Sequence, residues 1–323
     1  MGREWEALER EAYVHKLLRH DGRALRLYQQ TIALCPASNS PTAIRCAISS
    51  ADVLTHSGDF GDAVLLFEDA IARAQHLGND LLAAEALSRL ARSHARAANV
   101  DGVADAITRG RELSRQRRIP AGYRALRFRV ELAEAAAAVG RADEARRLLH
   151  SLTQPGFSRL AGPAVSAPMM RATALVFKFD ATHACAARPN DRGVAAHALQ
   201  KAAAEFARAA AGYRDTGRGW RAVRCELQRA ECVRLLSTLL PVDAEQMLKE
   251  LELDLVVVCR ELAEMRDRLR TSFALWQLAE VRKRLGAKYL ASRLFAFSSE
   301  LQHQHISHRD SGELPAILHL PRL

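Results

Sequence analysis

The sequence contains few aromatic residues and almost no stretch in which apolar and polar residues alternate. Aromatic residues fill 6% of the 323 positions, and the period-two runs of Val, Ile, Thr and Tyr that are typical of strands are nearly absent. Alanine, the strongest helix former, is abundant. Glycine (17) and proline (10) are too few for a collagen-like chain or a linker. These features exclude a β-rich fold and favour an all-α fold.

Long apolar runs and paired cysteines are also missing. The longest apolar stretches, such as 135–139 and 255–259, fall far short of the ~20 residues that span a bilayer, so no membrane partner is expected. The first residues are charged throughout, which predicts no secretory signal. The six cysteines form no CxxC pair and predict free thiols. We therefore expect an intracellular, reducing compartment.

The motifs of common catalytic sites are absent from the sequence. It contains no glycine-rich phosphate loop, no dinucleotide fingerprint, no HExxH and no GxSxG. His303, His305 and His308 lie close together, but they fall in an expected tail without a rigid scaffold, so we predict no metal site. The tryptophans are interpreted as packing residues of helices. The chain is thus expected to be neither an enzyme nor a cofactor-binding protein.

A repeated spacing of small residues is the strongest pattern in the chain. A small residue is followed twelve positions later by a second small residue, and four positions after that by a large apolar one. The pattern occurs five times, and its first four copies begin 39, 40 and 42 residues apart. The copies are Ala12, Ala24, Tyr28; Ala51, Ala63, Phe67; Ala91, Val103, Ile107; Ala133, Ala145, Leu149; and Ala279, Ala291, Phe295.

This spacing resembles the signature of tetratricopeptide repeats, in which two helices cross where small residues let their backbones approach. Gly58, Gly140 and Gly286 lie seven positions after the first small residue, where a helix is expected to stop and turn. The resemblance implies an all-α, right-handed superhelix of about seven helical hairpins. Ala51, Ala91 and Ala133 are predicted to be buried at the hairpin crossings.

Breaks in the pattern predict how the chain is organised. Residues 1–153 are expected to form the N-terminal hairpins, and a Pro- and Gly-containing stretch at 154–167 is expected to be a loop. Residues 168–302 are expected to form further hairpins with longer helices, and 303–323 an extended tail. The helices expected in the longer-helix region lie near 168–187, 194–214, 218–239 and 243–269.

The net charge of +10 comes almost entirely from arginine, because only six of the 47 basic residues are lysine. Arginine suits bidentate recognition of carboxylates and phosphates. The stretch 109–118 alone holds five arginines. The alternative is that the arginines form a solvated surface. Aromatic residues are not interleaved with the basic ones, so a nucleic-acid partner is not predicted.

In tetratricopeptide superhelices the first helix of each hairpin lines a concave groove. Positions −6, −3, +1, +4 and +5 from the small residue of that helix are expected to face inward. The groove then leans basic, which favours an acidic or carboxylate-ended peptide as its ligand; the alternative is that these side chains merely face solvent. The candidate groove residues are Arg45, Asp52, His56, Arg92, Arg96, Arg127, Glu134, Glu280, Lys283 and Arg284.

The C-terminal part, about 130 residues, resembles anaphase-promoting complex subunit 5. The resemblance rests on a helical hairpin with a Leu-Gly turn, a Leu-Phe helix and a Pro, Ile, His-Leu tail, together with the tyrosine and arginine layout of 209–236. It implies a non-catalytic scaffold in a large ubiquitin ligase of the cell cycle, with other subunits as partners and a nuclear and cytoplasmic location. The matching residues are Leu285, Gly286, Leu294, Phe295, Pro315, Ile317, His319 and Leu320.

Two further expectations concern partners. Leu314, Ile317, Leu318 and Leu320 place four large apolar residues in the tail, which we expect to pack on the last hairpin or on a neighbouring subunit.

Residues 57–94 resemble the 40-residue sensor repeats of bacterial transcription regulators. The alternative function is therefore a cytoplasmic bacterial sensor that binds a peptide or small ligand in the groove.

Overall fold

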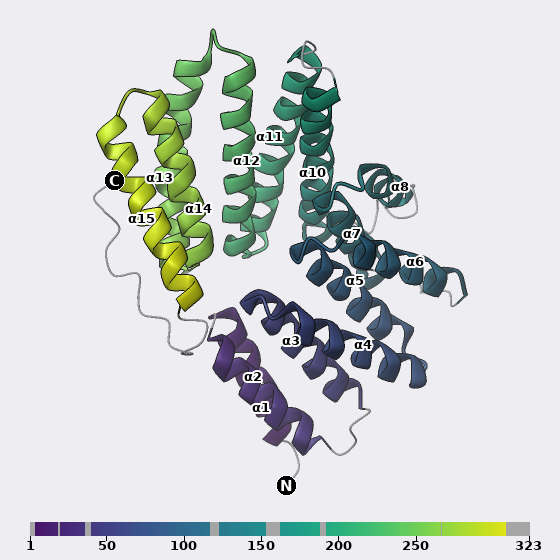
Figure 1. Ribbon diagram of the computed structural model, residues 1–323. Coiled ribbons are helices and arrows are strands. Elements are labelled where there is room, and N and C mark those ends of the chain that lie inside the picture. The colour runs from purple at the N-terminus through teal and green to yellow at the C-terminus, as the bar shows by residue number, and fades with distance from the viewer. Residues whose placement is uncertain are drawn as a thin grey trace. The chain divides into compact units, whose positions relative to one another are not determined.

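A computed structural model shows an all-α protein (Figure 1). The chain divides into two compact units, unit 1 (Met1–Ala161) and unit 2 (Gly162–Leu323). All regular secondary structure in the described residues is helical, and the fourteen helices confirm the prediction of about seven hairpins. The described residues are 4–18, 20–35, 40–116, 123–152, 162–187, 192–265 and 267–307.

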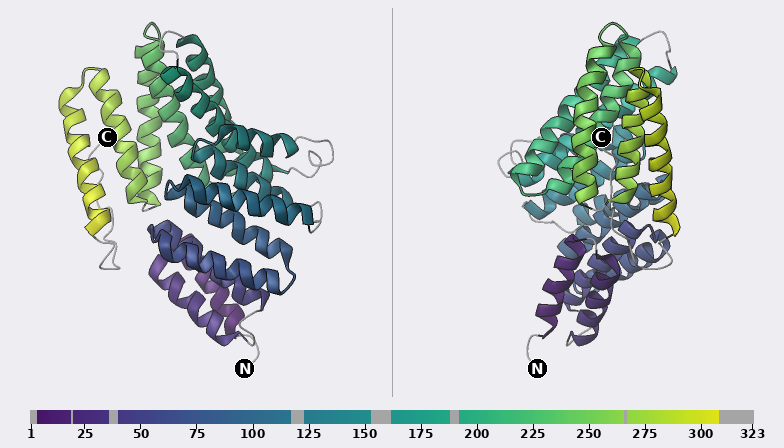
Figure 2. Two further views of the ribbon diagram at one scale, coloured as in Figure 1. Left: turned by 45° about the vertical axis from the view of Figure 1, so that its right-hand side comes forward. Right: turned by 90° about the vertical axis from the view of Figure 1, so that its left-hand side faces the viewer.

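Each hairpin consists of two consecutive antiparallel helices, which we call its first and second helix (Figure 2). The helices of unit 1 are α1 (Glu4–Leu17), α2 (Asp21–Leu34), α3 (Pro41–Ser57), α4 (Phe60–His76), α5 (Asp80–Arg96), α6 (Val100–Gln116), α7 (Tyr123–Ala138) and α8 (Ala142–Leu152). Those of unit 2 are α10 (Pro163–Ala187), α11 (Arg192–Asp215), α12 (Gly219–Leu239), α13 (Ala244–Glu264), α14 (Arg268–Arg284) and α15 (Lys288–Ser307).

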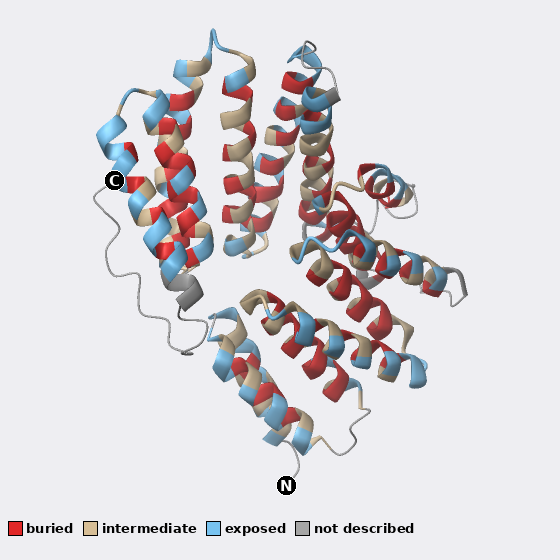
Figure 3. Ribbon diagram, in the orientation of Figure 1, coloured by how far each residue is buried: buried red, intermediate tan, exposed pale blue. Residues whose placement is uncertain are grey.

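The repeated small residues lie where the sequence predicted them. Ala51, Ala91 and Ala133 are fully buried in the first helices α3, α5 and α7. Phe67, four positions after the second small residue of its hairpin, is also fully buried. A methyl side chain lets neighbouring helices approach closely, and the larger residue fills the space beside the crossing. Figure 3 shows the buried residues on the helix sides that face neighbours within each unit.

The predicted turns are also confirmed. Gly58, Gly140 and Gly286 follow a first helix and adopt positive φ angles of 88°, 79° and 89°. Glycine reaches this left-handed region without the steric cost of a Cβ atom. The equivalent position of the third hairpin is occupied by Ala98, at a φ of 54°.

Three predicted boundaries are wrong. α10 begins at Pro163, five residues before the predicted start, because proline suits the first position of a helix, and Pro168 then lies inside it. The helix expected at 243–269 ends at Glu264, and Asp267 starts α14 by accepting a hydrogen bond from the backbone of Arg270. α15 continues to Ser307, so 303–307 are helical rather than extended. The rest of the tail, with Leu314, Ile317, Leu318 and Leu320, lies outside the described residues.

Each unit has its own apolar core. One cluster of unit 2 joins α12 to α15 around Leu255 and Leu278, and a second joins α10 to α12 around Phe206. A cluster in unit 1 joins α1 to α3 around Tyr28. In the described part of the chain, no helix combines the length and the apolarity that crossing a bilayer requires.

Candidate binding surface on the first helices

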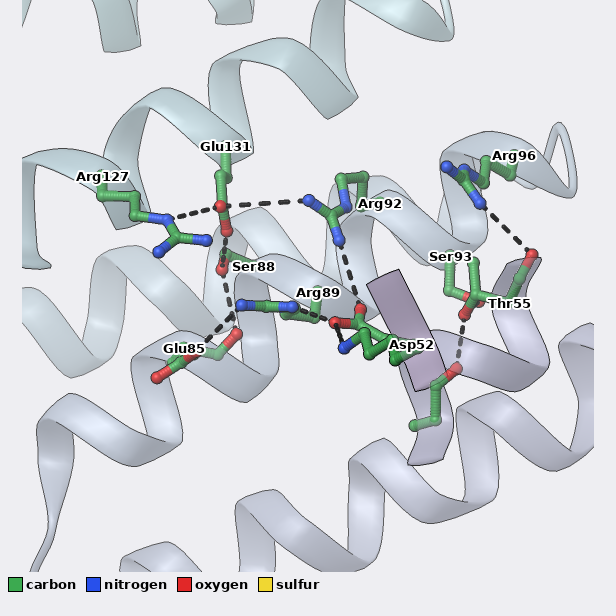
Figure 4. Close-up of polar contacts among 12 residues, drawn as sticks. Asp52, Thr55, Glu85, Ser88, Arg89, Arg92, Ser93, Arg96, Arg127 and Glu131 are labelled. Atoms are coloured by element: carbon green, nitrogen blue, oxygen red, sulfur yellow. Dashed lines mark hydrogen bonds and ion pairs between the residues drawn. The ribbon is translucent and has the colours of Figure 1, made fainter. Parts of the chain in front are cut away.

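Three of the predicted groove residues, Asp52, Arg92 and Arg127, meet in one network on the first helices of unit 1 (Figure 4). Asp52 of α3 lies at one centre of this network. Its carboxylate accepts a hydrogen bond from Lys16 Nζ of α1 at 2.9 Å and from Arg92 Nη2 of α5 at 3.2 Å, and it also pairs with Arg89 of α5. Asp52 therefore ties α1, α3 and α5 together.

Glu131 of α7 forms the second centre. It accepts a hydrogen bond from Ser88 Oγ of α5 at 2.7 Å and from Arg127 Nε, one turn earlier on α7, at 2.9 Å. Arg92 Nη1 lies 4.0 Å from Glu131 Oε1, and Figure 4 shows Arg92 and Arg127 approaching the carboxylate from opposite sides. Arg92 thus bridges both carboxylates. We call Lys16, Asp52, Glu85, Arg89, Arg92, Arg127 and Glu131 the charged cluster; Glu85 belongs to it through Arg89, at 3.0 Å.

The cations of the cluster keep its buried carboxylates ionised. Burial raises the pKa of Asp52, but the charges of Arg89, Lys16 and Arg92 outweigh this effect and hold the pKa well below its usual range. Burial acts in the same way on Glu131, whose pKa is lowered to about 2 by the neighbouring arginines and the hydrogen bond from Ser88. Both side chains are therefore anions at neutral pH.

Acids and bases of the cluster differ in exposure. Asp52 and Glu131 are 3–4% exposed, whereas the side chain of Arg127 is 34% exposed and that of Arg92 is 20% exposed. Within the described residues, the hydrogen bond that Arg127 donates to Glu131 comes from its Nε, and no hydrogen bond from its terminal nitrogens is seen there. The solvent side of the cluster therefore presents guanidinium groups, which can receive an anionic group.

The other predicted residues of unit 1 lie beside the cluster or apart from it. Arg96 Nη1 donates to the backbone oxygen of Thr55 at 3.4 Å, next to Asp52 along α3. His56 is half-buried and its charge acts on Asp52, while Glu134 is buried on α7. Arg45 lies apart from the cluster: its Nε is 3.9 Å from Glu9 Oε1 of α1.

In unit 2 the predicted residues Glu280, Lys283 and Arg284 lie on α14. Glu280 is half-buried, and Lys283 and Arg284 are exposed. Arg284 donates to Ser237 Oγ at 2.8 Å and to the Ser237 carbonyl oxygen at 3.1 Å, which joins α14 to the end of α12.

The interpretation of the tryptophans as packing residues is wrong for two of the three. Trp220 and Trp276 are more than a third exposed, and arginine side chains lie over their rings; Trp5 is half-buried. Arg224 lies over the Trp220 ring, and Arg234 and the Phe273 ring lie against Trp276, so these contacts leave part of each ring exposed. Trp276 also occupies position −3 from Ala279, one of the positions that the groove rule assigns to the inward face.

Sequence reasoning missed Lys16, Arg89 and Glu131. Arg89 and Glu131 each precede the small residue of their helix by two positions, which is a repeated polar position in an otherwise apolar stretch. That repetition is the signal that could have identified them. Lys16 carries no comparable signal, because its partner Asp52 lies 36 positions away.

The arginine-rich stretch of α6 contributes ion pairs between second helices. Arg109 makes a two-pronged contact with Glu68 of α4, with both nitrogen–oxygen distances at 2.7 Å. Arg111 pairs with Glu144 of α8 at 3.0 Å. In the described residues no group of three or more His, Cys, Asp or Glu side chains is arranged to hold a metal ion, and all six cysteines carry free thiols.

Comparison with known proteins gives structural similarities only. No protein-family model matches the chain, and no curated protein matches it. BtubC from P. vanneervenii is 18% identical, with 68% of this chain and 90% of that chain covered and a TM-score of 0.41. A Rap protein complexed with Competence and Sporulation Factor is 13% identical, with 95% of this chain and 99% of that chain covered and a TM-score of 0.39. A circular tandem repeat protein is 14% identical, with 95% of this chain and 77% of that chain covered and a TM-score of 0.28.

These similarities are too distant to bear on function. None of them supports the resemblance to anaphase-promoting complex subunit 5. What the structure itself shows is an all-α protein of stacked helical hairpins.

Proposed function

We propose that this protein is a non-catalytic helical-repeat scaffold that binds other proteins. Its charged cluster takes an acidic or carboxylate-ended segment of the partner. The observation that supports this most directly is the exposure pattern of the cluster, in which Asp52 and Glu131 are buried and the guanidinium groups of Arg92 and Arg127 are partly exposed.

The chemistry of the cluster suits a carboxylate. A guanidinium offers parallel N–H donors that match the two oxygens of a carboxylate group. Arg127 is already held by Glu131, so part of the entropy of orienting it is lost before the partner binds. Because the site is open to solvent, its attraction for the partner is expected to weaken with added salt.

The two more specific hypotheses predict different partners. The resemblance to anaphase-promoting complex subunit 5 predicts that the captured proteins are other subunits of that ubiquitin ligase. The resemblance to bacterial sensor repeats predicts RNA polymerase or a histidine-kinase system, with a peptide or small ligand at the same residues. Affinity purification followed by mass spectrometry distinguishes them.

The role of the cluster is tested by reversing the charge of two arginines while Lys16, Arg89 and Arg92, the cations that pair with Asp52, stay unchanged. We expect the double variant Arg96→Glu, Arg127→Glu to lose the partner captured by the unchanged protein, because two donors become repelling carboxylates. The helical circular dichroism at room temperature should stay the same, since Lys16, Arg89 and Arg92 still neutralise Asp52 and Arg89 and Arg92 still act on Glu131, but the thermal midpoint should fall because Glu131 loses Arg127.

A matched control has the same change in net charge. Arg26 and Arg147 are exposed on the second helices α2 and α8, and their double reversal to Glu should leave capture intact. Unaltered capture by the Arg96, Arg127 variant would show that these arginines are only a solvated surface. Equal loss in both variants would show that capture depends on net charge alone.

A further inference from the structure

An exposed apolar stripe runs along α14 in unit 2. Leu269, Phe273 and Trp276 follow one another at helical spacing and are 47%, 37% and 37% exposed. The opposite side of the same helix is apolar too, because Leu275 and Leu278 are fully buried in the core. A helix that is apolar on both sides is normally covered on both sides. The stripe therefore has the character of an interaction surface.

Cations without acidic partners lie beside the stripe. The guanidinium of Arg234, on α12, lies 5.3 Å from the centre of the Trp276 ring, and the Phe273 ring stacks beside Trp276 at 6.1 Å. Among the described residues no carboxylate lies within 4 Å of Arg234 or Arg284, whereas Arg92, Arg127, Arg224 and Arg282 on the first helices each have one. In the described part of the chain, Arg284 donates hydrogen bonds only to neutral oxygens of Ser237 and Arg234.

We propose that this aromatic–arginine surface, formed by Leu269, Phe273, Trp276, Arg234 and Arg284, binds an acidic segment of a partner protein that also carries apolar side chains. The apolar side chains of that segment cover the stripe, and its carboxylates pair with the two guanidinium groups. The surface shares no residue with the charged cluster of unit 1. It is therefore a second interaction site, independent of the one proposed above.

The arrangement favours a protein segment over a single-stranded nucleic acid. Nucleic-acid bases need an open ring face to stack on. Arg234 and Phe273 already lie against Trp276, and on α12 the guanidinium of Arg224 lies 4.5 Å from the centre of the Trp220 ring. Side-chain methyl groups can still pack along the stripe without an open ring face.

The test selects random 12-residue peptides displayed on phage against the immobilised full chain. We expect the selected peptides to combine Asp or Glu with Leu, Ile, Phe or Trp. Their affinity should fall about tenfold or more in Trp276→Ala and in Arg234→Gln, as for a central interface residue. Circular dichroism confirms that each variant remains helical.

Matched controls lie on α15, where Tyr289 is 74% exposed and Arg293 is exposed. Tyr289→Ala and Arg293→Gln should bind the selected peptides as the unchanged chain does. Peptides without acidic residues, or equal binding by all four variants, would overturn the proposal. So would competition by a 12-nucleotide poly(U) that the Trp276 and Arg234 variants abolish, which would assign the surface to nucleic acid.

The test must also distinguish a partner protein from the chain's own C-terminal tail as the segment that covers the stripe. If residues 308–323 cover the stripe, the library will yield no binders on the full chain but will yield them on a chain that ends at Ser307. That result would overturn the proposal in favour of an intramolecular contact. Binders of equal affinity for both chains support a partner protein.

Discussion

At the scale of single residues, buried carboxylates are tolerated in unit 1 because each one faces several cations. Asp52 faces Lys16, Arg89 and Arg92, and Glu131 faces Arg92 and Arg127. Removing one member of such a network leaves its partners buried with unbalanced charge, which typically costs about 3–5 kcal/mol. The cluster therefore orders the first helices relative to one another as well as presenting arginines to solvent.

Acid should destabilise the protein through these two carboxylates. The pKa of Glu131 is about 2 in the folded protein, below its value in the unfolded chain. A lowered pKa adds stability above the unfolded value, and that stability is lost as the pH falls towards the folded value. We expect the urea midpoint to fall steeply between about pH 5 and pH 2. Glu131→Gln should be less stable at pH 7 and lose less on acidification. Parallel pH curves for both proteins would contradict this assignment.

The crossing alanines should not tolerate larger side chains. Ala51→Leu adds three carbon atoms at a fully buried position between helices. Overpacking of this kind costs about 1–3 kcal/mol, so the thermal midpoint should fall. Ala33→Leu, at an exposed position of α2, is the control and should change little. A stable Ala51→Leu variant would mean that the crossing has room that the structure does not show.

At the scale of helices, the turns after α3, α5, α7 and α14 each contain one left-handed residue. Gly286 has a φ of 89° and open space around its Cα, so Gly286→Ala tests the backbone alone. Ala98 has a φ of 54° at the equivalent position of the third hairpin. An L-residue in this region costs about 1–2 kcal/mol. Gly286→Ala should lower stability by about 1 kcal/mol and Ala98→Gly should raise it. If the thermal midpoints of Gly286→Ala and Ala98→Gly shift in the same direction, the left-handed backbone does not explain the stability of these turns.

At the scale of the whole molecule, the two units should fold separately. The apolar clusters around Tyr28, Phe206 and Leu255 each belong to one unit, and a unit that has its own core can fold alone. We expect fragments 1–161 and 162–323 each to be helical and to melt cooperatively.

The control fragment begins at residue 189, which removes α10 and uncovers Ala196 and Phe206 of α11. It should be less helical and aggregate more readily than 162–323. If both long fragments are unfolded while the full chain melts in one step, the units depend on each other for stability.

The sequence by itself determined the hairpins and most of their turns. Helical spacing, the small residues at Ala51, Ala91 and Ala133, and the glycines that end helices act over a few neighbouring positions, so they can be read along the chain. The same local reasoning placed Asp52, Arg92 and Arg127 on one side of the first helices. It failed at Asp267, where an N-cap interrupts an otherwise continuous helical pattern.

Only the tertiary structure decided which charges pair and which aromatic rings stay exposed. Lys16 meets Asp52 and Ser88 meets Glu131 across 36 and 43 positions, and such pairs depend on how neighbouring helices dock. Trp276 is of a residue type that usually packs in a core, yet it is 37% exposed, with Arg234 of α12 and Phe273 of its own helix against its ring. Spacing along one helix specifies a face, but the neighbouring helix determines what covers that face.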